Sequence, residues 1–408
     1  MKILHTADWH LGKRLEHFSR LEEQREVMDE IVEIADSEQV DAVIIAGDLF
    51  DTFNPATEAV ELFYRTLKRL SANGKRPVVA IAGNHDSPDR IEAPNPLARE
   101  NGILFSGYPS SQMRPLSLES GLQVTNSEPG FVELKLPTVE YPLRLLLTPY
   151  ANEFRLRKFL GADDEEEALR QLLKQRWNEL SDKWCDNSGV NILMTHLFMI
   201  PEGAAPPEEP DDEKPILHVG GAQVIYKSAV PDAIQYTALG HLHRYRIVGN
   251  EAANPAVYTG SPLSYSFSEA GQDKFVVIVD AEPGKAVSRR AVKLNGGKKL
   301  FRKRFETVDK AIEWLEANPD TLVELTLVAD EYLKAADRKR LQRIHDGIVT
   351  IIPEIRRKGQ EERAAKQIDL KQDMDELFRQ YFSHEHGQDP NQELMELFRE
   401  IKAEKGSK

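Results

Sequence analysis

Several short apolar runs in this chain are each followed, directly or after one alanine or glycine, by an aspartate, an asparagine or a histidine, and this repeated pattern constrains the fold more than any other feature. The runs are 2–6, 41–46, 77–82, 190–195 and 236–239. Short β-branched runs of this kind are typical of strands buried on both faces of an α/β sheet. Because ligand sites of open α/β sheets collect at the carboxyl ends of the strands, the sequence predicts one polar site built from several strand ends.

The central residue of this site is Asp48, which follows Gly47 at the end of the run 41–46. A lone Gly-Asp after a strand is also a common turn that caps the next helix. The companion motifs favour a metal centre in which Asp48 bridges two ions. The candidate ligands are Asp8, His10, Asp48, Asn84, His196, His241 and His243. Oxygen and imidazole donors without a thiolate suit manganese, iron or zinc.

Spacing and charge add two expectations. Asp8 and His10 are two residues apart, and such side chains point the same way on extended chain, so we expect them to face one ion. Two divalent ions outweigh the charge of two carboxylates, so the centre attracts phosphate and stabilises an in-line transition state. Taken singly, His196 could be a packed core residue, and His241 with His243 could be a polar strand end. Six further histidines lack such a context, and we interpret them as structural or surface residues: His5, His17, His218, His345, His384 and His386.

The chain of 408 residues is long enough for two to three domains. Periodicity predicts an amphipathic helix over 20–37, a helix from Pro55, a hairpin over 122–136 and a helix over 163–180. A small β-α-β-α-β pattern follows the turn at 282–284, with strands near 300–305, 322–328 and 348–352 and helices near 308–317 and 332–343. The expected domains are 1–282 (catalytic), 283–355 (small α/β), 356–369 (charged linker) and 370–408 (two helices).

Composition limits the class of protein. The formal net charge of −14 argues against nucleic-acid binding through bulk charge, although a local cationic site remains compatible with it. The single cysteine, Cys185, excludes a disulfide within the chain and fits a reducing cytosol. The N-terminus lacks the pattern of a signal peptide, and no run approaches the ~20 apolar residues of a membrane span. We therefore expect a cytoplasmic protein without a membrane partner.

Together these motifs resemble the calcineurin-like metallophosphoesterase superfamily, which implies a four-layer α/β sandwich of two mixed β-sheets flanked by helices. Within it, the stretches 5–12 and 258–267 resemble the nuclease subunits of bacterial SbcCD complexes, relatives of the eukaryotic and archaeal double-strand-break repair nuclease. Specific motifs carry the resemblance over residues 1 to about 280. Beyond that, it rests on architecture alone, a small capping domain and a pair of C-terminal helices.

The resemblance implies a role for each site residue. One ion would be held by Asp8, His10, Asp48 and His243, and the second by Asp48, Asn84, His196 and His241. His85 would act as the acid or transition-state stabiliser beside the scissile phosphate, and its neighbour Asp86 would orient a ligand. Asp51 is the third candidate catalytic residue. Archaeal and eukaryotic relatives carry a histidine where this chain has Asp51, so a second catalytic imidazole is not expected here.

The resemblance also implies cofactor, substrate and partners. We expect manganese, with magnesium, iron and zinc as alternatives, and a nucleoid-associated bacterial enzyme acting on DNA ends, hairpins and single strands. The expected partner is an SMC-type coiled-coil ATPase, in a heterotetramer built on a homodimer of this chain. Helix-in-groove recognition of that partner would use the apolar faces of the terminal helices. Its candidate contacts are Leu377, Phe378, Tyr381, Leu394, Leu397 and Phe398. Alternatively, these helices pack on each other or on the small domain.

Two other functions compete with the nuclease. A phosphomonoesterase or cyclic-nucleotide phosphodiesterase would use the same ligands but would not explain the small domain and the terminal helices. A non-catalytic scaffold on the same fold would be expected to lack ligands, whereas the set here is complete.

Overall fold

The computed structural model describes residues 1–156, 165–204, 224–249, 254–329 and 333–355, with individual positions between 375 and 399. Contacts divide the chain into two compact units, 1–328 with 333–354 and 329–332 with 355–408. Within the described ranges, no helix combines the length and apolar character needed to cross a bilayer.

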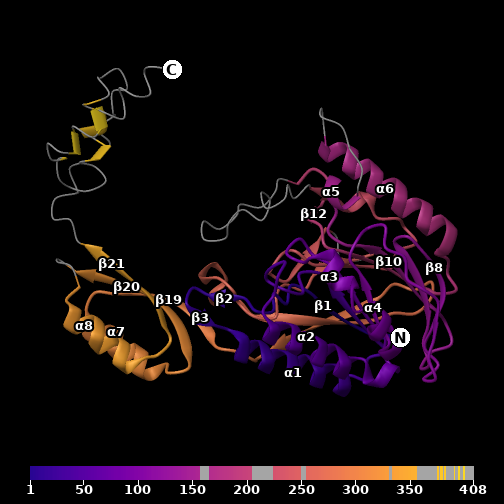
Figure 1. Ribbon diagram of the computed structural model, residues 1–408, viewed down its shortest axis with the longest axis horizontal. Helices are drawn as coiled ribbons and strands as arrows, with labels where there is room; N and C mark the ends of the chain where they lie inside the picture. The colour runs from indigo at the N-terminus through magenta and orange to yellow at the C-terminus, as the bar shows by residue number, and fades with distance from the viewer. Residues whose placement is uncertain are drawn as a thin grey trace. The chain divides into compact units, whose positions relative to one another are not determined.

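A six-stranded sheet forms the first half of the catalytic region, in the order β18-β17-β1-β4-β5-β6 (Figure 1). Its parallel strands are β1 (Lys2–Thr6), β4 (Ala42–Ala46), β5 (Val78–Ile81) and β6 (Ile103–Ser106), and the antiparallel strands β17 (Lys274–Asp280) and β18 (Ser288–Leu294) extend it at one edge. Helices α1 (Leu21–Ser37) and α2 (Thr57–Leu70) cover its outer face.

An eight-stranded sheet forms the second half, in the order β15-β16-β14-β11-β10-β9-β8-β7. Its strands are β7 (Leu116–Ser117), β8 (Gln123–Glu128), β9 (Phe131–Lys135), β10 (Leu143–Thr148), β11 (Val190–Thr195), β14 (Tyr236–Leu239), β15 (Arg246–Val248) and β16 (Ala256–Tyr258). The neighbours β10, β11, β14 and β16 run parallel, so their carboxyl ends share one edge. Helix α6 (Glu165–Trp184) covers the outer face of this sheet (Figure 1).

Alternation along each strand builds the layers. In β4, Val43 and Ile45 pack with the helices α1 and α2. Their neighbours Ala42 and Ile44 face the second sheet and pack in the core between the sheets. A shift of one residue would reverse both sets, so two-sided burial fixes the register. The result is four layers, helices, sheet, sheet and helix, which confirms the predicted sandwich.

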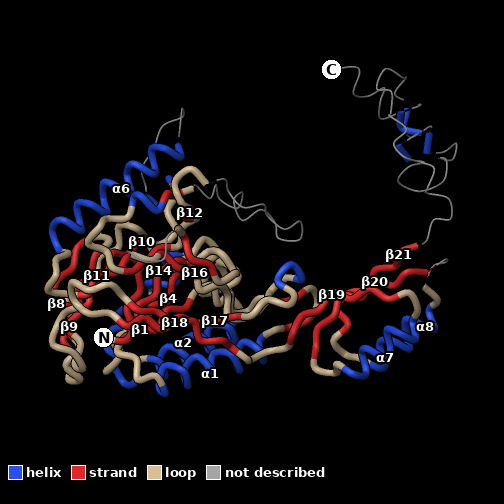
Figure 2. Tube along the Cα trace, turned by 180° about the vertical axis from the view of Figure 1, so that it is seen from behind, coloured by secondary structure: helices blue, strands red, loops and turns tan. Residues whose placement is uncertain are grey.

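The remaining helices and strands of the first unit are short or belong to the small α/β region (Figure 2). The short ones are β2 (Arg14–Leu15), β3 (Phe18–Ser19), α3 (Pro88–Glu92), α4 (Asn95–Ala98), α5 (Glu153–Leu156), β12 (Met199–Ile200) and β13 (Ile225–Tyr226). The small region comprises β19 (Lys299–Phe305), α7 (Val308–Ala317), β20 (Thr321–Ala329), α8 (Ala335–Ile344) and β21 (Ile348–Ile355), with the strand order β19-β20-β21. Its β-α-β-α-β order is the predicted one.

Some details differ from expectation. Helix α2 begins at Thr57 instead of Pro55, because Ala56 still has extended backbone. Strands β6 and β18 were not predicted from the sequence. Since β18 pairs with β17, the first sheet continues past the predicted domain boundary at residue 282.

In the second unit, the two aromatic faces predicted for the terminal helices meet each other. The rings of Phe378 and Phe398 stack with centroids 4.1 Å apart and 8° between their planes. Arg399 Nε donates to Asp375 Oδ2 at 2.7 Å. Tyr381 keeps 59% of its surface exposed. Of the candidate partner contacts, Leu397 lies outside the described residues.

Candidate metal centre

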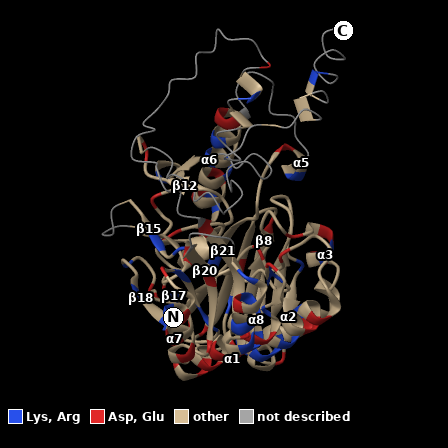
Figure 3. Cartoon of the chain, turned by 90° about the vertical axis from the view of Figure 1, so that its left-hand side faces the viewer, with Lys and Arg blue, Asp and Glu red and all other residues tan. Residues whose placement is uncertain are grey.

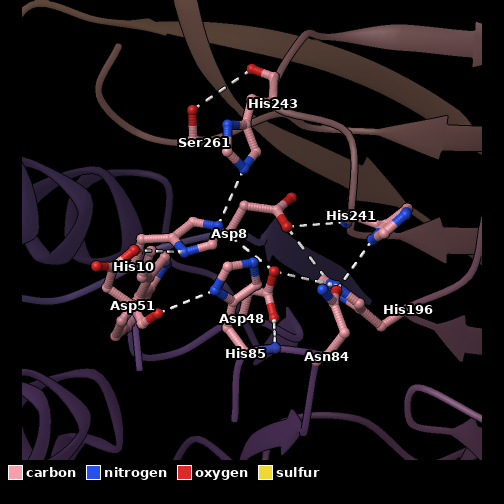
Figure 4. A network of polar contacts seen from close by, with 12 residues as sticks. Asp8, His10, Asp48, Asp51, Asn84, His85, His196, His241, His243 and Ser261 are labelled. Atoms are coloured by element: carbon pink, nitrogen blue, oxygen red, sulfur yellow. Dashed lines mark hydrogen bonds and ion pairs between the residues drawn. The ribbon is translucent and has the colours of Figure 1, made fainter. Parts of the chain in front are cut away.

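The seven candidate ligands meet where the carboxyl ends of strands from both sheets come together (Figure 4). Asp8, Asp48 and Asn84 follow β1, β4 and β5 of the first sheet. His196 and the pair at 241 and 243 follow β11 and β14 of the second. Parallel strands place their carboxyl ends on one edge, so residues scattered over more than half of the chain form one cluster, as the strand pattern predicts.

Asp48 lies at the middle of the cluster. Its Oδ2 is 3.4 Å from His10 Nε2 on one side and 3.3 Å from His196 Nε2 on the other. Its Oδ1 accepts a hydrogen bond from the backbone N–H of His85 at 2.9 Å. One carboxylate thus faces imidazoles from both halves of the site.

Two groups of donors flank Asp48. In the first, His10 Nε2 and His243 Nε2 lie 3.0 Å apart, and Asp8 offers an oxygen within 4.8 Å of both imidazoles. In the second, Asn84 Oδ1 lies 3.0 Å from His196 Nε2 and 3.1 Å from His241 Nδ1. Each group converges on a point from several directions, as metal ligands do.

The backbone at the ligands is not extended. Asp8, His10, Asp48 and His241 all have positive φ, at 53°, 43°, 49° and 99°. Asp8 and His10 do face the same point, but the reason expected from the sequence is wrong, because tight left-handed turns and not an extended strand aim them. Such conformations cost of order 1–3 kcal/mol each and cluster at functional sites.

Glycines give the ligands room. A Cβ at Gly83 would lie 2.1 Å from Asp48 Oδ1 and 2.2 Å from Asp48 N. A Cβ at Gly240 would lie 1.8 Å from the carbonyl oxygen of Ala46. Side chains and backbone of the two sheets approach so closely here that only glycine fits.

We expect Gly83→Ala to lower both the melting temperature and the affinity for divalent ions, because the added methyl displaces Asp48 or the loop 83–86. Differential scanning fluorimetry and calorimetric titration with manganese measure the two effects. Gly271→Ala is the matched control, since its Cβ meets nothing within 4 Å and only its φ of +77° is strained, at about 1–2 kcal/mol. Equal losses of ion affinity in the two variants would contradict the close approach at Gly83.

Two buried carboxylates, Asp8 and Asp48, lie close together in the cluster, so their negative charges repel each other. The pKa of Asp8 is raised to about 7, because burial and, to a smaller extent, the nearby Asp48 charge outweigh the lowering by His196 and His243. Burial also raises the pKa of Asp48, but His196 and His10 outweigh it and leave this pKa well below its ordinary value. A cation between the two carboxylates would relieve their repulsion.

The imidazoles and the unpartnered atoms fit a divalent cation. Burial lowers the pKa of His241 to about 3 and the pKa of His10 well below its usual value, which favours neutral rings that can donate a lone pair. Burial also lowers the pKa of His196, but Asp48 and Asp8 raise it to about 9. Burial lowers the pKa of His243 too, but Glu269 raises it. A cation would therefore displace a proton from these last two rings. Within the described residues, Asp8 Oδ2 and His241 Nε2 are buried without a hydrogen-bond partner. Buried polar atoms rarely lack partners, and the donor set matches the ligands of a metal centre.

His85 and Asp51 lie beside the cluster and Asp86 lies behind it. His85 Nδ1 donates to the carbonyl oxygen of Asp51 at 2.9 Å, which leaves its Nε2 for another partner. Asp86 accepts from the backbone N–H groups of Leu49 and Phe50 at 3.0 Å each and of Gly83 at 2.8 Å. Its carboxylate therefore ties the loop after β5 to the loop after β4, although burial raises its pKa to about 6.

Sequence reasoning missed residues that hold the ligand loops. Buried Arg155 donates to the carbonyl oxygens of Gly83 (2.7 Å), Asn84 (3.3 Å) and Asp86 (2.8 Å). It follows the end of β10, so its place after a parallel strand was the signal available for it. Glu269 lies behind His243, and although burial raises its pKa, Lys274 and His243 lower it to about 2. Only its nearness to the stretch 258–267 could have pointed to Glu269.

Comparison with known proteins agrees with this geometry. The family model for the calcineurin-like phosphoesterases matches residues 1–245. Three similar proteins are named as SbcD, the nuclease subunit of SbcCD. The one from Bacillus subtilis is 37% identical over 98% of this chain and 97% of its own length. Those from Rhodobacter capsulatus and Staphylococcus epidermidis are each 32% identical, over 70% and 72% of this chain and 68% and 70% of theirs. The chain therefore belongs to the calcineurin-like phosphoesterase family and, within it, to the group of the SbcD nucleases.

Proposed function

We propose that this chain is the manganese-dependent nuclease subunit of an SbcCD-type complex. It would cleave duplex DNA from its ends as a 3′–5′ exonuclease and cut single strands and hairpins as an endonuclease. The observation that carries the proposal is Asp48, whose Oδ2 lies between the imidazoles of His10 and His196. A carboxylate shared by two groups of donors is what a two-metal phosphodiester hydrolase requires.

The donors divide between two ions around this carboxylate. Asp8, His10, Asp48 and His243 would hold one ion, and Asp48, Asn84, His196 and His241 the other. When bound, two divalent ions supply an activated water and stabilise the charge of the in-line transition state. Both ligand carboxylates are deeply buried, so water is excluded around them and electrostatic interactions in the centre are strengthened.

His85 handles a proton beside the centre. Its Nδ1–H is held by the Asp51 carbonyl oxygen, so the exchangeable site is Nε2, where the ring can stabilise or protonate the departing oxygen. His85 and His10 lie with ring centroids 4.9 Å apart and nearly perpendicular planes. Asp86 and Arg155 hold the loop that carries His85 in place through the hydrogen bonds described above.

The substrate follows from the charge of the centre rather than of the surface. The charged residues of α1 are mostly acidic and those of α2 are of both signs (Figure 3), and the chain carries a net charge of −14. Attraction for the phosphate backbone would thus come from the ions, and the partner would supply further contacts to the duplex. Roles in DNA repair, recombination and replication, and a place at the nucleoid in the cytoplasm, follow from this substrate.

Digestion assays test the proposed function. The purified chain is incubated with hairpin DNA, linear duplex, single-stranded DNA and p-nitrophenyl phosphate, each with manganese, with magnesium and with a chelator. We expect manganese-dependent cleavage of the DNA substrates and weak hydrolysis of the monoester. Preferential hydrolysis of p-nitrophenyl phosphate would favour a phosphomonoesterase instead.

The proposed partner is an SMC-type coiled-coil ATPase, in a heterotetramer with two copies of this chain. Deleting residues 368–408 should leave a folded, manganese-dependent nuclease that no longer co-purifies with the ATPase, because the segment carries exposed apolar surface, such as the ring of Tyr381, that would enter a groove of the partner. Co-expression and pull-down measure the binding, and duplex digestion with ATP measures the loss of stimulation.

A point variant separates docking from packing within the segment. Tyr381→Ala removes an exposed ring without touching the stack of Phe378 on Phe398, and it should weaken ATPase binding. Phe378→Ala removes the stack itself. Full ATPase binding by the truncated chain would refute the docking role, and a fall in its melting temperature would favour packing of the helices on the rest of the chain.

A further inference from the structure

His243 is held by a buried network that the catalytic role of the site does not use. Glu269 Oε1 lies 3.5 Å from His243 Nδ1, and the Glu269 side chain is only 3% exposed. The backbone N–H of Tyr265 donates to the same oxygen at 3.0 Å, and Ser261 Oγ donates to Oε2 at 3.3 Å. Lys274 Nζ pairs with Glu269 and also donates to the carbonyl oxygen of His243 at 2.9 Å. Ring and backbone of His243 are thus fixed together.

His10 has a matching arrangement that is more open. Asp51 Oδ1 lies 3.7 Å from His10 Nδ1, beyond hydrogen-bond distance, and this nitrogen has no hydrogen-bond partner among the described residues. Lys13 Nζ lies 2.8 Å from the same oxygen. The side chains of Asp51 and Lys13 are 25% and 26% exposed. In both cases a lysine neutralises a carboxylate, and the carboxylate stands behind the Nδ1 of a candidate ligand.

The orientation of the His10 and His243 rings shows what the carboxylates behind them do. A carboxylate behind Nδ1 keeps the proton on that nitrogen and leaves the lone pair on Nε2. The two Nε2 atoms of His10 and His243 lie 3.0 Å apart, beside Asp48 and Asp8. Both lone pairs therefore point to the same place.

The imidazoles of the other group are held differently. His196 Nδ1 donates to the carbonyl oxygen of Ala46 at 2.8 Å. The contact of His241 Nδ1 with Asn84 Oδ1, at 3.1 Å, joins two candidate ligands of the same ion, so it is not a partner behind the ring. A neutral carbonyl oxygen polarises an imidazole less than a carboxylate does. The two halves of the centre are therefore built unequally.

We infer that Glu269 is a positioning residue for the ion held by Asp8, His10, Asp48 and His243, and that it makes this the tighter of the two divalent-cation sites, with Asp51 in a weaker version of the same role. The inference rests on the ligand set of the proposed function. It assigns a role to the segment 261–274, whose side chains hold Glu269 in place although none of them touches the reacting atoms.

Glu269→Gln tests the charge behind His243. We expect calorimetric titration of the full chain with manganese to show one ion bound as in the wild type and the other about 10- to 100-fold more weakly, the usual cost of losing such a partner of a ligand. In DNA cleavage the manganese concentration for half-maximal rate should rise while the rate at saturating manganese changes little. Asp51→Asn should produce a smaller shift in the same direction.

Glu269→Gln leaves the buried Lys274 without its charged partner and could lower stability for that reason alone. A double variant avoids this effect. Glu269→Leu with Lys274→Met replaces the buried pair by apolar groups, a change that is often neutral for stability, and it removes the partner of His243 altogether. Glu133→Gln is the matched control, because Glu133 pairs with Arg144 at 2.8 Å on β9, away from every ligand. Melting temperatures in chelator separate loss of folding from loss of the ion.

The outcomes distinguish this inference from the proposed function. A wild-type chain that binds fewer than two ions overturns the ligand set and the inference with it. A wild-type chain with two ions, together with a double variant whose two affinities are unchanged, overturns the role of Glu269 alone. Selective weakening of one ion, with Glu133→Gln behaving as the wild type, supports it.

Discussion

Asp48→Ala is expected to reduce DNA cleavage to background, by more than about 100-fold, because a shared ligand costs more than the 10- to 100-fold typical of a residue behind a ligand. The side chain lies between His10 and His196, so its removal affects both ions at once. Elemental analysis after saturation with manganese should find at most one tightly bound ion in the variant and two in the wild type.

Asp41→Asn is the matched control for this change. Asp48 follows β4, whereas Asp41 precedes this strand at its opposite end. There the carboxylate of Asp41 accepts a hydrogen bond from the backbone N–H of Lys2 at 2.7 Å. It should keep both ions and full turnover. A wild-type chain that holds no more than one ion under saturating manganese would refute a bridging Asp48.

His85→Gln is expected to keep the metal content near that of the wild type while turnover falls by ~10²-fold or more, the usual size of a lost acid–base contribution. The change leaves all seven candidate ligands in place. Glutamine can still donate to the Asp51 carbonyl oxygen, which His85 contacts at 2.9 Å, so the loop after β5 should keep its conformation. Single-turnover cleavage and elemental analysis measure the two quantities.

His17→Gln, at an exposed histidine on the hairpin of β2 and β3, should change neither metal content nor turnover. Loss of an ion from His85→Gln would show that His85 is a ligand. Unchanged turnover would remove it from the chemistry.

The sequence predicts those parts of the structure in which a type of residue has a single structural role, such as apolar residues in buried strands. Buried strands need apolar residues on both faces, so β4 and β11 are continuous apolar runs, and the polar residue after each run marks the edge where the site forms. Strand β18 was not predicted, because it is an edge strand with an exposed, charged face. Strand β6 was not predicted either, because it has only four residues within a weakly patterned region.

The supporting residues of the site could not be predicted for a related reason. Arg155 and Glu269 act through tertiary contacts with loops far away in the sequence, and a single buried charge has no periodicity. The turns at Asp8 and His10 likewise depend on pairing with the next strand end, since the backbone N–H groups of both residues donate to the carbonyl oxygens of Gly47 and Asp48. An extended Asp-x-His was the simplest local geometry, and tertiary hydrogen bonds replaced it.

Because the ligands come from both sheets, the order of synthesis of the chain limits when the centre can form. Asp8, His10, Asp48 and Asn84 leave the ribosome early, whereas His241 and His243 follow more than 150 residues later. A nascent chain that has made β1, β4, β5 and β6 carries these first donors, but β17 and β18, which complete the first sheet, follow the strands of the second sheet in sequence. Contacts over such long separations form late in folding. Loading of the two proposed ions is therefore expected to be a late step of biogenesis, which follows completion of both sheets.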